Sequence, residues 1–399
     1  MVAALSPSDP FAPAPLGPLT LRNRIVKAAT FEGMTPRNVV TDRLIEFHRR
    51  FAAGGVGMTT LAFCAVSADG CGTPNEMVLT GEAVPGLKRL AEAVHGEGAA
   101  VSAQLGHAGA VAAGTGHRAL SPSPIFSPLA MRRTRAVSED DIARITADFG
   151  RAARIVADAS FDAVEVHLGH GYLPSEFLSP KLNRRTDRWG GSLENRARFC
   201  RDVVRAVRDA VGDRLAVIAK LNMADGVPGG LWLDESIEVA LMLQTDGALD
   251  AIELTAGSSL QNPMYLFRGD APVHEMAAVM PQPVRTVFRL LGRRFLRAYP
   301  FEEAYLLPYA RQFRAALDMP LVLLGGVNRL DTIRRARSEG FELVAMGRAL
   351  LREPDLVNRL QAGTTQESLC IHCNKCMPTI YRGTHCVLVP AEERPGWRA

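Results

Sequence analysis

The feature that most constrains the fold is an alternation of short apolar runs with longer amphipathic stretches along the 399-residue chain. Eight such runs have the length and apolar character of buried strands, and helical patterns separate them. Strands that alternate with helices favour an α/β fold with a parallel sheet. Eight repeats, with no Gly-x-Gly-x-x-Gly after the first strand, predict a closed (β/α)8 TIM barrel rather than a doubly wound open sheet. The predicted strands are 24–28, 56–61, 99–104, 161–167, 215–221, 249–255, 321–324 and 343–346, and the predicted helices are 41–53, 84–97, 139–159, 193–211, 233–245, 305–317, 331–338 and 354–360.

Composition narrows the class of protein further. A hydrophobic fraction of 47% is sufficient for a full core, and the net charge of +4 comes with no basic tract that alternates with aromatic residues, so nucleic acid is not an expected partner. No apolar stretch reaches about 18 residues, so no membrane span is predicted. The Pro- and Ala-rich N-terminus is unlike a signal peptide. We expect a cytoplasmic protein with one barrel domain over 1–365, a lid-like insertion at 260–300 and a Cys-rich tail over 366–399.

A cluster of polar residues follows the fourth apolar run directly. In VEVHLGHGY, residues 164–172, glycines end the run, so we expect His167 at the C-terminal tip of a strand and His170 and Tyr172 on the loop beyond it. Two neutral imidazoles can donate hydrogen bonds to one oxygen, and a phenol can deliver a proton without ionising at neutral pH. These three residues are therefore candidate catalytic groups for a substrate carbonyl that gains negative charge while its neighbouring carbon takes a proton.

The next segment, PSEFLSPKLNRRTDRWGGSLENRARF at 174–199, together with VEVHLGHGYL, closely resembles the signature of the old yellow enzyme family, which are flavin-dependent ene-reductases and their relatives. The resemblance implies FMN as cofactor, NADH or NADPH as hydride source, and an α,β-unsaturated carbonyl compound as small-molecule substrate. It also implies that His167 and His170 hold the carbonyl oxygen and Tyr172 protonates the α-carbon, while hydride passes from flavin N5 to the β-carbon.

Candidate FMN contacts lie at the ends of five predicted strands, and the resemblance places them around the flavin. The Gln104 amide offers a donor and an acceptor to the pyrimidine edge, and Lys220, where the family usually has arginine, supplies positive charge near N1 and C2. Glycines after the last two strands free backbone N–H groups for one phosphate, and Arg348 adds its guanidinium. One phosphate site favours FMN over a dinucleotide. The predicted cofactor-binding residues are Ala29, Thr30, Gln104, Lys220, Gly325, Gly326, Gly347 and Arg348.

The tail contains a second chemical motif. Cys370, Cys373 and Cys376, with the more distant Cys386, have the ligand count of a 4Fe-4S cluster or a closed zinc site, and free thiols are the alternative. Relatives that resemble 2,4-dienoyl-CoA reductase and trimethylamine dehydrogenase carry a cluster near this point. A dienoyl-thioester reductase or an amine demethylase-like flavoenzyme is therefore an alternative function. From a different class, Lys220 also fits Schiff-base chemistry in a non-redox, phosphate-binding lyase or isomerase barrel.

Two connections are unusually long. Residues 109–138 lack helical periodicity and predict a long loop over the barrel mouth. Residues 283–299 predict a helix with arginines on one face. This arginine face is either a lid that guides an anionic substrate or nicotinamide phosphate, a surface for a partner subunit in a homo-oligomer, or simply a face exposed to solvent.

Overall fold

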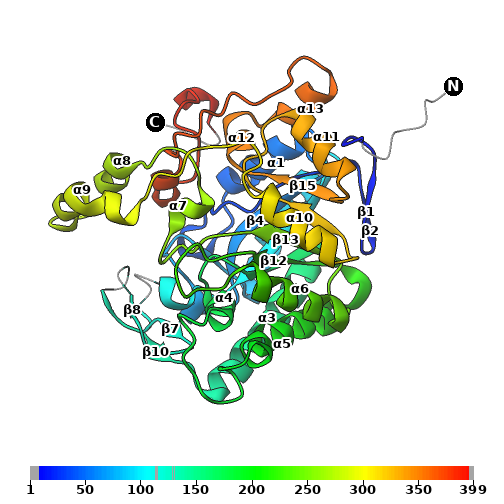
Figure 1. The fold of residues 1–399 in the computed structure, drawn as a ribbon. Coiled ribbons are helices and arrows are strands. Elements are labelled where there is room, and N and C mark those ends of the chain that lie inside the picture. Colours follow the sequence, from blue (N-terminus) through cyan, green and yellow to red (C-terminus); the bar gives the residue numbers. More distant parts are fainter. Residues whose placement is uncertain (1–8, 113–115, 128, 130, 395–399) are drawn as a thin grey trace.

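The predicted (β/α)8 barrel is confirmed in the structure, a computed structural model that describes residues 9–112, 116–127, 129 and 131–394. Eight parallel strands form the barrel in the order β3–β15–β14–β13–β12–β11–β6–β4, and a pairing between β3 and β4 closes it (Figure 1). Each predicted strand is present, although β4 runs four residues beyond its predicted end. The strands are β3 (Ile25–Lys27), β4 (Met58–Ala65), β6 (Ala100–Gly106), β11 (Ala163–Leu168), β12 (Ala216–Asn222), β13 (Ala251–Thr255), β14 (Leu321–Leu323) and β15 (Leu343–Met346).

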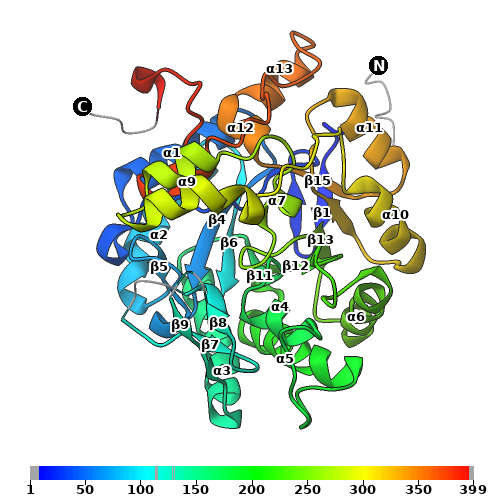
Figure 2. The ribbon, with the colours of Figure 1, turned by 60° about the vertical axis from the view of Figure 1, so that its left-hand side comes forward.

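Helices surround the barrel, as the two ribbon views show (Figures 1 and 2). All eight predicted helices form, with ends within two residues of the predicted ones. Local signals explain the starts: the Thr41 hydroxyl accepts a hydrogen bond from the Leu44 amide, and Ser138 forms a capping box with Asp141. The helices are α1 (Asp42–Ala53), α2 (Val84–His95), α3 (Glu139–Asp158), α5 (Leu193–Val211), α6 (Leu233–Asp246), α10 (Leu307–Ala316), α11 (Leu330–Ser338) and α13 (Leu356–Gln361), with the shorter α4 (Leu173–Leu178) and α12 (Arg348–Arg352) at strand ends.

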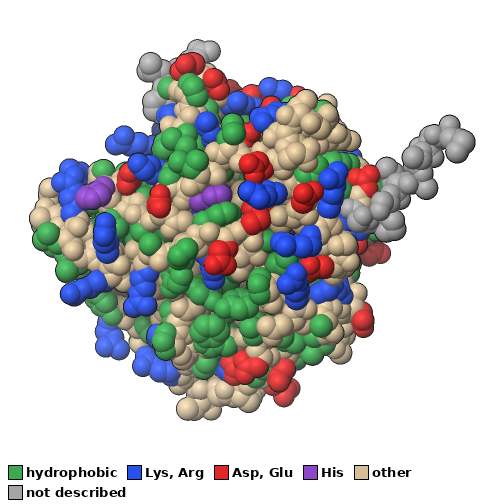
Figure 3. All heavy atoms as spheres, turned by 45° about the horizontal axis from the view of Figure 1, so that its top comes forward, with side chains coloured by type: hydrophobic (Ala, Val, Ile, Leu, Met, Phe, Trp, Pro, Cys, Tyr) green, Lys and Arg blue, Asp and Glu red, His purple; other side chains and the backbone are tan. Residues whose placement is uncertain are grey.

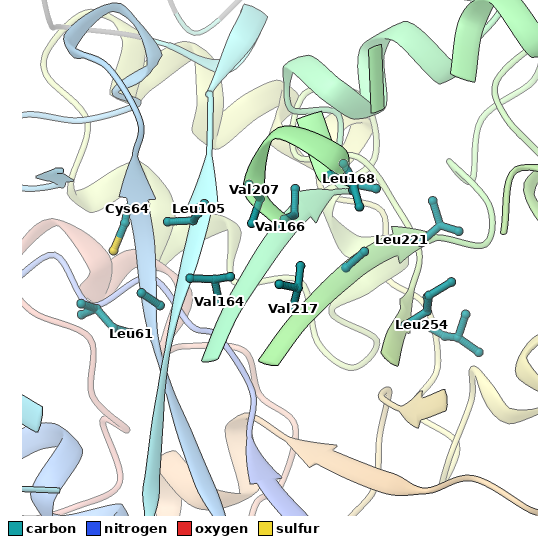
Figure 4. Close-up of a cluster of buried hydrophobic side chains, with 14 of the residues drawn as sticks. Leu61, Cys64, Leu105, Val164, Val166, Leu168, Val207, Val217, Leu221 and Leu254 are labelled. Carbon is teal, nitrogen blue, oxygen red and sulfur yellow. The ribbon is translucent and has the colours of Figure 1, made fainter. Parts of the chain in front are cut away.

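Side chains of each barrel strand alternate between the helical layer and the barrel interior. On β11, Val164, Val166 and Leu168 belong to the large hydrophobic cluster that includes side chains of the surrounding helices (Figure 4). Because successive side chains of a strand point to opposite faces, Glu165 and His167 are directed into the barrel. The apolar side chains of β11 thus pack against the helices, and its polar side chains face the barrel interior.

The N-terminal arm covers the end of the barrel at which the strands begin. β1 (Ala14–Leu16) and β2 (Leu19–Leu21) form an antiparallel hairpin. Its buried leucines cluster with Ala163 and Ala216, the first residues of β11 and β12. The N-terminal ends of the strands are therefore sealed by apolar packing, which leaves the C-terminal ends for a functional site.

The two long connections contain more regular structure than the sequence predicts. Residues 109–138 include two small two-stranded sheets, formed by β7 (Leu120–Ser121) with β10 (Arg135–Ala136) and by β8 (Phe126–Ser127) with β9 (Arg132–Arg133). Such two-residue strands leave no periodicity in the sequence. The later insertion contains α9 (Val284–Phe295), which lies within the helix predicted over 283–299, and two short helices that were not predicted, α7 (Pro263–Leu266) and α8 (Val273–Ala278).

Helices α8 and α9 project from the barrel (Figure 1), and α9 places apolar and basic side chains together on the surface (Figure 3). Val287 is 54% exposed and Leu290 is 79% exposed. None of the helices among the described residues has the length and apolar character needed to cross a lipid bilayer.

Candidate active site

The three predicted catalytic side chains lie together at the C-terminal end of β11. His167 is the penultimate residue of the strand, and His170 follows in a left-handed conformation with φ +60°. Gly171 also has a positive φ, and a Cβ there would lie 2.5 Å from the Ser258 hydroxyl, so the turn requires glycine. Nε2 of His167 is 3.2 Å from Nδ1 of His170, and the His167 and Tyr172 rings are 4.8 Å apart.

The contacts of the two imidazoles define where their protons lie. Nδ1 of His167 accepts a hydrogen bond from the Gly169 amide at 3.2 Å, so the proton of this ring belongs on Nε2 and is donated to His170. Nε2 of His170 then donates to the Thr255 hydroxyl at 2.7 Å. Burial and, to a smaller extent, the nearby Lys220 lower the pKa of both rings, that of His170 to about 3. Both imidazoles are therefore neutral, and each has one N–H group, which donates to an acceptor within the protein.

Tyr172 is held as a protonated phenol. Burial raises the pKa of this hydroxyl to about 12, the Glu76 carboxyl raises it as well, and a hydrogen bond with Ser259 lowers it. The Phe63 ring packs against it with centroids 5.0 Å apart. Phe63 was not predicted from the sequence, because it lies in the unpredicted extension of β4. The only local signal is the apolar run that continues past Leu61.

Inside the barrel, a buried lysine is held between two carboxylates. Nζ of Lys220 on β12 lies 2.8 Å from a carboxylate oxygen of Glu165 on β11 and 2.8 Å from one of Glu253 on β13. The side-chain amide of Gln104 on β6 donates a hydrogen bond to Glu165. The two carboxylates raise the pKa of Lys220, opposing the effect of burial. The counter-charge that a buried lysine requires is thus present. Neither acid was predicted, although each is the single acid within its strand as observed.

A protonated lysine does not fit Schiff-base chemistry, which requires an unprotonated amine with a lowered pKa. The lyase or isomerase interpretation of Lys220 therefore has no support in this geometry.

The remaining predicted cofactor residues follow the barrel mouth. Ala29 belongs to the same apolar cluster as Phe63 and Tyr172. The Thr30 hydroxyl accepts a hydrogen bond from the buried Lys27, and the Thr30 methyl group lies 3.7 Å from where a Cβ on Gly347 would stand. The predicted ring end and phosphate end of the flavin site are therefore adjacent.

The glycine turns after β14 and β15 differ in how closely other side chains approach them. Gly325 and Gly326 have positive φ, and a Cβ on either would meet the side chain of Leu306 or Tyr305 at 2.6 or 2.5 Å, so packing alone already requires glycine there. At Gly347 the space is open apart from the Thr30 methyl group. Arg348 donates from Nη1 to the Arg268 carbonyl at 2.8 Å and to Asn374.

A flavin mononucleotide fits this set of donors. A guanidinium has five N–H groups, so Arg348 keeps donors for a phosphate beyond those that its Nη1 uses. The open space beside Gly347 admits such a group next to it. The buried amide of Gln104 and the charge of Lys220 offer polar contacts that an isoalloxazine ring matches.

The four tail cysteines line one small cavity, of about 20 Å³, together with Arg348. All four are unpaired thiols. Burial raises the pKa of Cys376 to about 12, which the Arg348 charge opposes. Within the described part of the chain, no group of three or more His, Cys, Asp or Glu side chains is arranged to hold a single metal ion, so zinc has no support in the geometry. A cluster, which is wider than one ion, remains the prediction.

The neutral imidazoles, the protonated phenol and the buried Lys220 lie toward the C-terminal strand ends of an eight-stranded barrel, which is where enzymes of this fold have their active sites. The chain belongs to the NADH:flavin oxidoreductase / NADH oxidase family, whose family model matches residues 9–260. It is therefore an FMN-dependent enzyme that uses NADH or NADPH, and the non-redox lyase or isomerase alternative was wrong.

Several relatives extend this comparison. The chain is 55% identical over 390 residues to 4,4'-dithiodibutanoate disulfide reductase of Rhodococcus erythropolis, covering 97% of this chain and 96% of the relative. It is 35% identical to a metal reductase of Desulforamulus reducens, over 93% of this chain and 52% of the relative. A solved 2-naphthoyl-CoA reductase in complex with 2-naphthoyl-CoA is similar with a TM-score of 0.76 and 27% identity, over 90% of this chain and 53% of that one. The chain thus spans about half the length of several relatives.

Proposed function

We propose that this flavoenzyme reduces the C=C bond of an α,β-unsaturated carbonyl compound, with Tyr172 as proton donor. The observation that supports this most directly is a phenol with a pKa near 12 whose ring lies 4.8 Å from the ring of a neutral histidine. A carbonyl oxygen that gains negative charge is stabilised by neutral N–H donors, and the carbon beside it needs an acid that has kept its proton.

In this mechanism FMN supplies the hydride that NADH or NADPH has delivered to it. Gln104, Lys220 and the residues at 29–30, 325–326 and 347–348 would hold the cofactor. His167 and His170 exchange their internal acceptors for the carbonyl oxygen and polarise the C=C bond. Tyr172 transfers its proton to the α-carbon as the β-carbon receives hydride, so the product gains one hydride and one proton.

The test compares Tyr172→Phe with Tyr381→Phe, which changes the same atom on a tyrosine that is 47% exposed. With 2-cyclohexenone, Tyr172→Phe should slow reoxidation of the reduced enzyme by about 10²–10⁴-fold and leave reduction by NADH or NADPH unchanged. Tyr381→Phe should change neither step. Equal losses in both half-reactions of Tyr172→Phe would contradict the proton-donor role.

A second candidate is reduction of a disulfide, favoured by the 55% identity to a disulfide reductase over nearly the whole of both chains. In this reaction hydride adds to one sulfur, the S–S bond breaks, and a proton balances the second thiol product. A thiolate with a pKa of about 8.5 leaves without protonation, whereas a carbanion does not.

The two reactions therefore differ in their need for Tyr172. If the disulfide is the substrate, wild-type kcat/KM should be higher for 4,4'-dithiodibutanoate than for 2-cyclohexenone, and Tyr172→Phe should lower the disulfide rate by less than about tenfold. Higher kcat/KM for the enone would favour the first candidate.

We also propose that the tail cysteines bind a 4Fe-4S cluster, as in a dienoyl-thioester reductase or an amine demethylase-like flavoenzyme. The support is the convergence of Cys370, Cys373, Cys376 and Cys386 on one cavity. Iron analysis of anaerobically purified protein tests it: about four iron atoms per chain are expected for a cubane cluster.

A further inference from the structure

A buried carboxyl group with an unpartnered oxygen lies behind the proposed proton donor. Glu76, in the segment after β4, is only 5% exposed. Its Oε2 accepts hydrogen bonds from the backbone amides of Gly72 at 3.0 Å and Thr73 at 2.9 Å. Its Oε1 is buried and has no hydrogen-bond partner among the described residues. Such a group requires an explanation, because burying an acceptor without a hydrogen-bond partner is unfavourable.

The charge of the Glu76 carboxylate acts on three other described side chains. Glu76 raises the pKa of Cys64 on β4, of Cys71 on its own loop, and of Tyr172 on the loop after β11. Cys71, which precedes Gly72, packs in the same apolar cluster as Tyr172. The carboxyl therefore lies close to the phenol, on the side of the β4 loop.

The same surroundings keep this carboxyl protonated at neutral pH. Burial raises the pKa of Glu76 to about 8, and the two backbone hydrogen bonds lower it. Both histidines are neutral and Lys220 is fixed by two carboxylates, so none of these three described groups releases a proton near neutral pH.

The reduction consumes one proton from Tyr172 in each cycle, which leaves a tyrosinate that must be restored. We propose that Glu76 supplies this proton, so that it acts as a positioning residue through Tyr172 and not on the substrate. The inference rests on the proposed proton-donor role of Tyr172. The carboxyl O–H bond breaks, the phenol O–H bond forms, and the carboxylate takes a proton from solvent. Because the two described side chains share no direct hydrogen bond, the transfer runs through a water molecule.

The experiment separates the first turnover from later ones. In Glu76→Gln the amide oxygen still accepts the two backbone hydrogen bonds, but the side chain has no acidic proton. A single reoxidation of the reduced variant by 2-cyclohexenone uses the proton that Tyr172 already holds, so its rate should stay within about twofold of wild type. Steady-state kcat should fall by about tenfold or more. Wild-type kcat should decrease as pH rises through about 8, the pKa of Glu76, and the variant should lack this inflection.

Glu176→Gln is the matched control. Glu176 is also fully buried, accepts a backbone hydrogen bond from Ala110 and has one unpartnered oxygen, but it is not among the groups that raise the pKa of Tyr172. This variant should retain both the wild-type kcat and its inflection. Failure of Tyr172 itself would appear differently, as an unchanged single-turnover rate in Tyr172→Phe.

A Glu76→Gln enzyme with kcat within twofold of wild type and the same inflection near pH 8 would overturn the inference. If this variant does not fold, infrared spectroscopy of the holoenzyme tests whether the Glu76 carboxyl is protonated at neutral pH. The spectrum is compared with that of Glu176→Gln, because Glu176 is another buried carboxyl whose pKa is raised. A protonated carboxylic-acid C=O band at pH 7 that persists in Glu176→Gln and disappears above about pH 9 supports the inference, and its absence from Glu176→Gln at pH 7 overturns it.

Discussion

Replacing Lys220 with methionine tests the charge arrangement inside the barrel. The side chain is 2% exposed, and its ammonium group lies 2.8 Å from both Glu165 and Glu253. Methionine keeps the apolar stem and removes the charge, so two carboxylates remain buried with a hydrogen bond from Gln104 to one of them. Removing one partner of a buried ion pair costs about 3–5 kcal/mol, because the remaining charge is uncompensated. We expect the free energy of unfolding to fall by this amount at pH 8.

The loss should depend on pH in a defined direction. Burial already raises the pKa of Glu253 to about 7 from its usual 4.5, although Lys220 lowers it. Without Lys220 this pKa rises further. A carboxyl whose pKa is raised in the fold binds more protons folded than unfolded, so its unfavourable contribution grows as pH increases from about 4.5 through the folded value. The variant should therefore be less impaired at pH 5 than at pH 8, by about 1.4 kcal/mol for each unit of additional pKa shift.

Urea unfolding of the FMN-free proteins at the two pH values measures both effects, since bound cofactor would add its own stabilisation. Lys220→Arg keeps the charge and should lose much less stability than Lys220→Met. The double variant with Glu253→Gln should recover part of the loss. A Lys220→Met protein that is within 1 kcal/mol of wild type at both pH values would refute the reasoning.

Three further predictions concern the tail, a turn and a histidine. Cys373→Ser should lower the iron content and the broad visible absorption of a cluster while FMN stays bound; unchanged iron per chain would contradict the ligand role. Gly226→Ala should reduce stability by about 1–3 kcal/mol because φ is +71° and the new Cβ would lie 2.5 Å from the Tyr265 ring; an unchanged urea midpoint would count against it. Since burial lowers the pKa of His170 to about 3, the unfolded chain binds this proton first, so stability should decrease as pH falls below about 6.5, and NMR should show no titration of this ring between pH 6 and 8.

The sequence was sufficient for those features that depend on neighbouring residues. Alternating apolar runs and helical patterns predicted all eight strands and the helices between them, because periodicity is a local property. The Ser138 cap is a local feature of this kind, because its partner Asp141 lies three residues further along the chain. His167, His170 and Tyr172 fell within six residues and one turn, so a single segment placed them together.

What the sequence determined by itself is the barrel, the end of it that bears function, and the histidine–tyrosine cluster. The tertiary structure decided which distant side chains meet that cluster: Glu253 reaches Lys220 from the next strand, Phe63 and the Glu76 loop approach Tyr172 from β4, and Arg348 is bound to the tail through Asn374. The physical reason is that strand register in a closed barrel joins residues that are far apart in the chain, such as Lys27 of β3 and Met346 of β15. Register is fixed by packing of the whole core and leaves no local pattern in the chain.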